Sequence, residues 1–233
     1  MIKIKEVNVC CLEAAIRGMR NPMESHESSD SVLCKGADGF EDCTINPAGV
    51  CPRHNDFSYD VFCIGKDDYE LALKLCKAGS DHRKFMRMII VSMDVTAPLY
   101  WWKEYDTYKV GTVANSTSTM HKIHSKAFSR QDFSCDRMSE GALACLDSVI
   151  GVLEDARLKF VETKKKHYWD DMIQLLPSSY NQKRTIVLSY EVLRNMYHAR
   201  KNHKLDEWRD FCKWVEELPY SELITVQEGN SCD

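Results

Sequence analysis

The side chains best suited to hold a phosphate or a base lie in the segment Gly111–His121, which reads GTVANSTSTMH. Its hydroxyl and amide groups could hydrogen-bond phosphate, ribose or the edge of a base. A solvated Ser/Thr loop has the same composition, so residue types alone leave the two interpretations even. We expect a loop here, because the segment follows a helix that starts at Ala97-Pro98.

Aromatic residues dominate that preceding helix. Trp101, Tyr105 and Tyr108 recur at helical spacing and share a face, while Trp102 should point elsewhere. Aromatic side chains pack in cores and subunit interfaces as well as against ring-shaped ligands. We favour packing for this face.

Four basic side chains are candidates to pair with a phosphate: Lys103, Lys109, Arg200 and Lys201. Arg200 is the most interesting, because a guanidinium group holds phosphate or carboxylate with two parallel hydrogen bonds. A surface ion pair is the more frequent role for such a residue. The formal net charge of the whole chain is -4, which argues against nucleic-acid binding but leaves room for a local phosphate pocket.

Cysteine and histidine offer a different chemistry. Cys34, Cys43, Cys51 and His54 could ligate zinc, but the paired CxxC spacing is missing, so we predict no metal site. The 11 cysteines are odd in number, and the first residues lack a signal-peptide pattern, which favours reduced thiols in a cytoplasmic protein. No apolar run reaches the roughly 20 residues that span a membrane. The chain also lacks HExxH, GxGxxG, a Walker loop and a nucleophile elbow.

The elements that must position these groups are strands and helices in alternation. This order predicts an α/β or α+β fold: one domain over residues 1–233, with a central mixed sheet flanked by helices and a long helical segment. Residues 21–59 form a loop-rich insertion. The apolar patterns predict strands over residues 2–9, 85–95 and 184–190 and helices over residues 12–20, 66–79, 139–166, 167–176, 191–203 and 205–218. In the helix from Lys66, Asp67 or Asp68 is the expected N-cap and Gly79 the stop.

Two blocks of the sequence, taken together, resemble the flavin-dependent thymidylate synthase (ThyX) family. DHRKFMRMIIVSMDVTAPLYWWKEYDTYKVGTVANSTS has the length and hydrophobic pattern of the family block that carries the signature R-H-R-x7-S. LPSSYNQKRTIVLSYEVLRNMYHARKNHKLDEWRDF mirrors the later family segment with Asn-x-Arg-x-Leu, a helix and an arginine. The early AAIRGMR also resembles the family's Ala/Arg helix, so the similarity covers most of the chain in order.

The resemblance implies a set of positions on the FAD side. The signature falls on Thr107, Tyr108 and Lys109, of which only Lys109 keeps a positive charge. Ser189 stands in place of the family's asparagine and Glu191 in place of its arginine. The cofactor-binding positions implied in this way are His82, Arg87, Thr107, Tyr108, Lys109, Asn115 and Ser189.

The resemblance implies a second set of positions for the substrate deoxyuridylate (dUMP). Arg200 falls on the family arginine that contacts dUMP, and Thr117 keeps a hydroxyl group where the family has its serine. Arg200 and Thr117 are therefore the expected catalytic residues, and Arg200 would stabilise negative charge that develops on the pyrimidine. Lys103, Glu104 and Ser118 complete the implied substrate site.

The activity implied by the resemblance is methylation of dUMP to dTMP by a divergent flavin-dependent thymidylate synthase. Methylenetetrahydrofolate would donate the carbon and reduced FAD the hydride, with NADPH as a further co-substrate and a homotetramer as the assembly. An alternative is a catalytically inactive or repurposed relative that binds a nucleotide without flavin, since Thr107-Tyr108-Lys109 replaces the signature. A third is an interaction protein whose aromatic helix is an oligomer interface.

Overall fold

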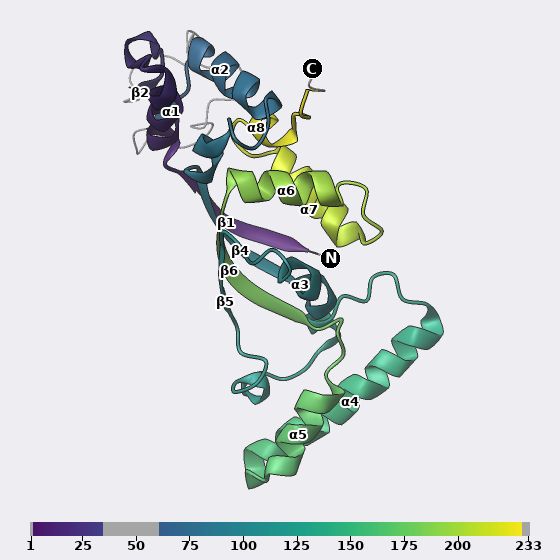
Figure 1. Ribbon diagram of the computed structural model, residues 1–233. Coiled ribbons are helices and arrows are strands. Elements are labelled where there is room, and N and C mark those ends of the chain that lie inside the picture. The colour runs from purple at the N-terminus through teal and green to yellow at the C-terminus, as the bar shows by residue number, and fades with distance from the viewer. Residues whose placement is uncertain (1, 35–60, 230–233) are drawn as a thin grey trace. The chain divides into compact units, whose positions relative to one another are not determined.

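The computed structural model describes residues 2–34 and 61–229 and has a mixed α/β fold, as predicted (Figure 1). The main sheet has the strand order β1-β4-β6-β5, and a smaller sheet pairs β2 with β3 in antiparallel orientation. The strands are β1 Lys3–Cys10, β2 Val32–Cys34, β3 Val61–Cys63, β4 Ile90–Pro98, β5 Thr112–Ser116 and β6 Asn181–Ser189. The α-helices are α1 Leu12–Arg20, α2 Lys66–Lys77, α3 Leu99–Tyr105, α4 Glu140–Thr163, α5 Lys166–Leu175, α6 Tyr190–Arg200, α7 Asp206–Glu216 and α8 Glu222–Thr225.

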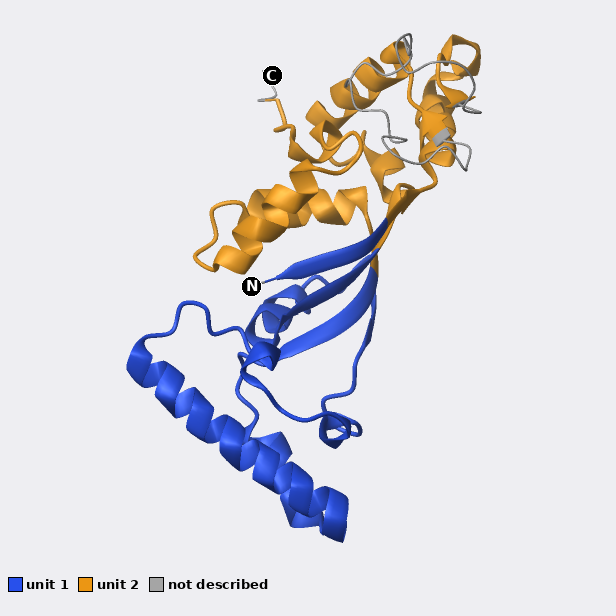
Figure 2. Ribbon diagram, turned by 180° about the vertical axis from the view of Figure 1, so that it is seen from behind, with its two compact units in different colours: residues 1–7, 93–186 blue, residues 8–92, 187–233 orange. Residues whose placement is uncertain are grey.

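The chain divides into two compact units, shown in blue and orange in Figure 2. Unit 1 comprises residues 1–7 and 93–186, and unit 2 comprises residues 8–92 and 187–233. Each is described by itself below. The single domain over residues 1–233, with its insertion at 21–59, stays a prediction.

The core of unit 1 lies along the long helix α4, which packs against α5. The Ser139 hydroxyl caps α4 by accepting the N–H of Ala142, as a serine at the N-cap favours. One face of α4 buries Leu146, Leu153 and Ala156, which pack in a cluster that includes Met172 of α5. Burying such apolar side chains contributes about 1.5–3 kcal/mol each.

The aromatic side chains Trp101, Trp102 and Tyr105 of helix α3 are buried, in agreement with the predicted packing role. Trp101 and Tyr105 are buried and stack at 5.4 Å between ring centroids. Trp102 is buried as well, and its indole N–H donates to the carbonyl of Gln182 at 2.9 Å. Tyr108 lies beyond the end of α3 and therefore does not extend the shared face.

Unit 2 is built from amphipathic helices. The helix α6 begins after Ser189, whose hydroxyl accepts the N–H of Val192 at 3.4 Å. It buries Leu193 and Met196 and packs against α7 and α8. The buried Cys63, Cys76 and Cys212 act as small apolar residues, and burial raises the pKa of the Cys76 and Cys212 thiols to about 12.

Three local predictions are corrected by the structure. Gly65 is the N-cap of α2, because the carboxylate of Asp30 accepts the N–H of both Asp67 and Asp68 and so replaces a cap from within the helix. The central strand starts at Ile90, after a short 3-10 helix at Lys84–Arg87. The expected loop at residues 111–121 contains the strand β5.

A buried ion pair ties α1 to α2 within unit 2. The Nε of Arg20 lies 2.6 Å from the Oδ1 of Asp68, and both side chains are buried. The second carboxylate oxygen, Oδ2, accepts the hydroxyls of Ser29 and Ser31 at 2.6 and 2.5 Å. Burial acts to raise the pKa of Asp68, but these hydrogen bonds outweigh it and hold the pKa below its usual range.

The lowered pKa of Asp68 predicts an acid-sensitive contribution to stability. A depressed folded-state pKa stabilises the fold above the unfolded value of about 3.9, and the effect is lost as the pH falls through the folded-state pKa. The free energy of unfolding of Asp68→Asn should therefore fall furthest below that of the parent near neutral pH, and the gap should narrow below about pH 4. Urea unfolding over this range measures the gap. The matched variant Asp155→Asn removes the carboxylate of an exposed ion pair with Lys159. Its free energy of unfolding should differ very little from that of the parent over the same pH range.

Candidate functional site

A pocket of about 540 Å³ in unit 1 brings together two of the predicted substrate residues, Thr117 and Ser118. They follow directly after the edge strand β5. Side chains from β1, β4 and β6 and from the segment around residues 122–132 complete its wall. The volume lies in the range of small-molecule sites, roughly 300–1,000 Å³.

Hydrogen bonds to β6 fix Thr117 in this pocket. Its N–H donates to the carbonyl of Lys183 at 2.9 Å, and its hydroxyl donates to the same oxygen at 3.3 Å. The side-chain amide of Gln182 donates to the Thr117 carbonyl at 2.7 Å. The Thr117 hydroxyl oxygen therefore keeps its acceptor capacity for a ligand.

Ser118 offers a ligand the opposite polarity. Its hydroxyl oxygen accepts the N–H of His121 at 2.8 Å and that of Met120 at 3.3 Å. Because the oxygen is occupied as an acceptor, the O–H is oriented to donate. The two adjacent hydroxyls can thus serve an acceptor and a donor on one ligand.

Four lysines make the pocket basic. Lys126 pairs with Asp132 and Lys183 with Asp94, each at 2.6 Å. The hydrogen bond to Asp132 raises the pKa of Lys126. Within the described ranges 2–34 and 61–229, neither Lys3 nor Lys122 has a carboxylate partner. These two ammonium groups are the ones available to an anion.

Aromatic side chains line another part of the wall. Phe128 is buried and Tyr180 is half-buried, with ring centroids 6.4 Å apart in an edge-to-face arrangement. Burial raises the pKa of Tyr180, so its phenol stays protonated at neutral pH. A flat ring bound in this pocket would meet apolar and aromatic surface.

The remaining predicted residues of unit 1 do not line this pocket. Lys103 and Lys109 are exposed, and Asn115 is exposed on β5. The Thr107 hydroxyl donates to the carbonyl of Glu104 at 2.7 Å, at the end of α3. The Tyr108 carbonyl accepts the hydroxyl of Thr112. The signature positions Thr107, Tyr108 and Lys109 therefore do not line the pocket that contains Thr117.

In unit 2, two of the predicted flavin-side positions are engaged internally. The Ser189 hydroxyl caps α6, and the Glu191 carboxylate lies 3.0 Å from the Nε of Arg83 in a buried ion pair. His82 and Arg87 are exposed. The guanidinium of Arg200, at the end of α6, lies 5.0 Å from the ring centroid of Trp208. This cation-π contact supports the Arg200 head group on an aromatic face.

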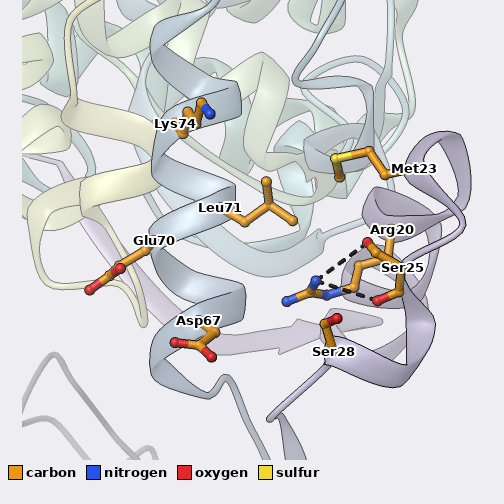
Figure 3. Close-up of a pocket in the computed structure, with 8 residues that line it drawn as sticks. All are labelled: Arg20, Met23, Ser25, Ser28, Asp67, Glu70, Leu71 and Lys74. Atoms are coloured by element: carbon orange, nitrogen blue, oxygen red, sulfur yellow. Dashed lines mark hydrogen bonds between the residues drawn. The ribbon is translucent and has the colours of Figure 1, made fainter.

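A second pocket of about 560 Å³ lies in unit 2 beside α2 (Figure 3). The Arg20 guanidinium hydrogen-bonds Ser25 there, at the edge of the space. Both Lys74 and the acidic Asp67 and Glu70 line it, so it has no dominant charge. It contains none of the predicted site residues, and the unit 1 pocket is therefore the candidate functional site.

Sequence reasoning missed the lysines of the unit 1 pocket. The basic residues in HKIHSK, which include Lys122 and Lys126, were the only local signal for them. Lys3 and Lys183 come from strands that the sequence places far from this segment. Pairing of β strands, which the sequence does not specify, brings them to the pocket.

Two expected absences concern metal and membrane. Among residues 2–34 and 61–229, no group of three or more His, Cys, Asp or Glu side chains is placed to hold a metal ion. Cys43, Cys51, His54 and the Cys34 side chain lie outside the described residues. In the same part of the chain, every helix is too short or too polar to span a bilayer.

Comparison of the structure with solved structures decides the fold. The structure of ThyX from Helicobacter pylori with FAD and dUMP matches this one at a TM-score of 0.59 and 15% identity. The match covers 95% of this chain and 94% of that chain. A second H. pylori ThyX complex with FAD and dUMP matches at a TM-score of 0.59 and 16% identity, over 94% of this chain and 96% of that chain. The fold is that of ThyX.

A third structure extends the ThyX fold to another nucleotide enzyme. PolB from Streptomyces cacaoi, a UMP/dUMP methylase bound with 5-Br dUMP, has a TM-score of 0.60 and 11% identity, over 97% of this chain and 96% of that one. No family model matches the sequence, and no curated protein matches it. The ThyX-like fold that the sequence predicted is thus confirmed by structural similarity alone.

Proposed function

We propose that this chain binds dUMP and methylates it to dTMP, as a divergent flavin-dependent thymidylate synthase. The observation that carries the proposal is the unit 1 pocket, in which Thr117 and Ser118 lie beside Lys3 and Lys122, for which residues 2–34 and 61–229 provide no carboxylate partner. The solved structures of the same fold contain dUMP or 5-Br dUMP, which supports a pyrimidine nucleotide as the ligand.

The pocket residues have complementary roles toward dUMP. Lys3 and Lys122 bind the phosphate by charge-assisted hydrogen bonds. The Thr117 hydroxyl accepts a hydrogen bond from the polar edge of the uracil ring, and the Ser118 hydroxyl donates one to it. The two bonds would fix the orientation of the ring. Phe128 supplies an apolar wall for the ring.

The residues available to FAD fit only in part. His82, Arg87, Lys109 and Asn115 present exposed polar groups that could bind its phosphates and ring edges. Ser189 and Glu191 do not fit, because the hydroxyl caps a helix and the carboxylate is neutralised by Arg83. Bound FAD would supply the hydride for methylation, with methylenetetrahydrofolate as the carbon donor and NADPH as co-substrate.

The Arg83–Glu191 pair specifically favours the second candidate, a dUMP-binding protein that works without flavin. The visible absorption spectrum of the purified protein, recorded after incubation with FAD and dUMP and then desalting, separates the two. A retained flavin band with dTMP formed from dUMP supports the synthase. Colourless protein that still binds dUMP supports the flavin-free protein, and absence of dUMP binding excludes both.

Arg200→Ala tests the substrate role that the resemblance implies for Arg200, a residue that does not line the unit 1 pocket. Loss of a charged hydrogen-bond donor should weaken dUMP binding by about 10- to 100-fold, since such a bond contributes roughly 1.5–3 kcal/mol. Isothermal titration calorimetry measures the change. Arg209→Ala is the control, because that guanidinium is occupied by Asp206 and two backbone carbonyls. Unchanged affinity in Arg200→Ala would remove Arg200 from the site.

The assembly and location proposed with this activity are a homotetramer in the cytoplasm. The helix α4 supports an interface, because its large apolar side chains Val152, Leu158 and Val161 are exposed. Light scattering during size exclusion measures the mass, and a monomer would contradict the tetramer.

A further inference from the structure

Besides Arg20, unit 2 buries two further arginines, Arg83 and Arg194. Arg83 and Arg194 are 6% and 2% exposed. Arg83 pairs with the buried carboxylate of Glu191, while the Nη1 of Arg194 donates to the carbonyls of Leu223 and Ile224 at 3.2 and 3.1 Å. Burial lowers the pKa of Arg194, and the positive charge of Arg83 lowers it further.

The charges of this cluster balance only through the C-terminal segment. Arg83 contacts both carboxylates, the buried one of Glu191 and that of Glu228, while Arg194 interacts with the two through their charge alone. Burial lowers the pKa of the neighbouring His198, which keeps that ring neutral at neutral pH. Without Glu228 the cluster would carry one uncompensated positive charge.

Glu228 is held less firmly than its partners. Its side chain is 53% exposed, against 7% for Arg83. It lies beyond α8, where the next residue, Gly229, donates its N–H to the carbonyl of Lys77 at 3.0 Å. A half-exposed carboxylate on a chain segment beyond the last helix can be exchanged, whereas Arg83 and Arg194 together keep one positive charge more than Glu191 compensates.

We propose that Arg83 and Arg194 form an oxyanion-binding site, which the Glu228 carboxylate fills in this structure and which a phosphate group can occupy in its place. The planar fork of a guanidinium matches the oxygens of phosphate as it matches those of carboxylate. The phosphate can come from inorganic phosphate or from a nucleotide. The site uses residues of unit 2 alone, so it does not depend on the dUMP pocket of unit 1.

Glu228→Gln in the full chain tests the site, because it removes the competing charge and keeps the shape. The thermal midpoint is followed against inorganic phosphate at constant ionic strength. We expect phosphate to stabilise Glu228→Gln with an affinity at least about tenfold tighter than for the parent. Glu217→Gln, at an exposed position beside α7, should respond like the parent. A chain ending at Gln227 should respond like Glu228→Gln.

A second substitution links the response to the arginine. Adding Arg83→Gln to Glu228→Gln should abolish the stabilisation by phosphate. A repeat with dUMP distinguishes the sources. Because dUMP bound in the unit 1 pocket stabilises all variants alike, only the part of a response that Glu228→Gln gains and Arg83→Gln removes belongs to this site. Such a part for inorganic phosphate identifies the free phosphate group, and such a part for dUMP alone identifies the nucleotide. Equal responses of Glu228→Gln and the parent to both ligands, or a gain that survives Arg83→Gln, would overturn the proposal.

Discussion

Replacing Lys3 and Lys122 together by glutamine should weaken dUMP binding by about 100-fold or more. Each ammonium is expected to contribute a charge-assisted hydrogen bond to the phosphate, roughly 1.5–3 kcal/mol apiece, and each 1.4 kcal/mol is about tenfold in affinity. The pair is chosen because Lys126 and Lys183, in the same pocket, are neutralised by Asp132 and Asp94. Titration calorimetry at fixed ionic strength measures the loss.

The controls separate a local contact from a general loss of positive charge. Lys159→Gln removes one charge from α4, outside the pocket, and should leave the affinity for dUMP unchanged. Each single variant, Lys3→Gln and Lys122→Gln, should show part of the effect. An affinity of the double variant within about threefold of the parent would place the phosphate elsewhere.

Arg83→Met should lower the free energy of unfolding by about 3–5 kcal/mol, because it leaves the Glu191 carboxylate buried without a counter-charge. The side chains of this pair are 7% and 10% exposed. The exposed pair Arg17–Glu13, at 63% and 64%, is the control, and Arg17→Met should cost less than about 1 kcal/mol. Urea unfolding measures both variants.

A compensating substitution sharpens this second test. Adding Glu191→Gln to Arg83→Met removes the stranded charge, so the double variant should regain a large part of the lost stability. If the double variant is less stable than Arg83→Met alone, the cost arises from lost packing of the arginine side chain and the ion-pair account fails.

The helices α1 to α7 and the strands β1, β4 and β6 could be predicted in their order, because their apolar periodicity is strong. The helix α1 has the predicted bounds, and α4 and α7 differ from the prediction only at their ends. The strand β5 was missed because it lies at the edge of the sheet, where four of its five residues are exposed and no alternation of burial marks it. The helix α2 was predicted, but its cap was not, because the capping carboxylate of Asp30 comes from outside the helix.

The candidate site was predictable only where it is continuous in sequence. Thr117 and Ser118 stand in a hydroxyl-rich run that residue types alone left even between a ligand site and a solvated loop, and only the resemblance gave them a substrate role. Lys3 reaches the same pocket through the pairing of β1 in the sheet, which no local pattern specifies. The engagement of Glu191 by Arg83 likewise depends on a contact between distant segments.

The Arg83–Glu191 pair also constrains which substitutions either of the two positions can accept. If position 191 once carried the arginine that the resemblance places there, the change to glutamate would have buried an unpaired carboxylate unless residue 83 was already basic. The reverse step, Glu191→Arg, would now bring a third guanidinium beside Arg83 and Arg194. Neither residue can be exchanged alone without a buried uncompensated charge, so the two positions should have changed together and should covary among descendants of this lineage.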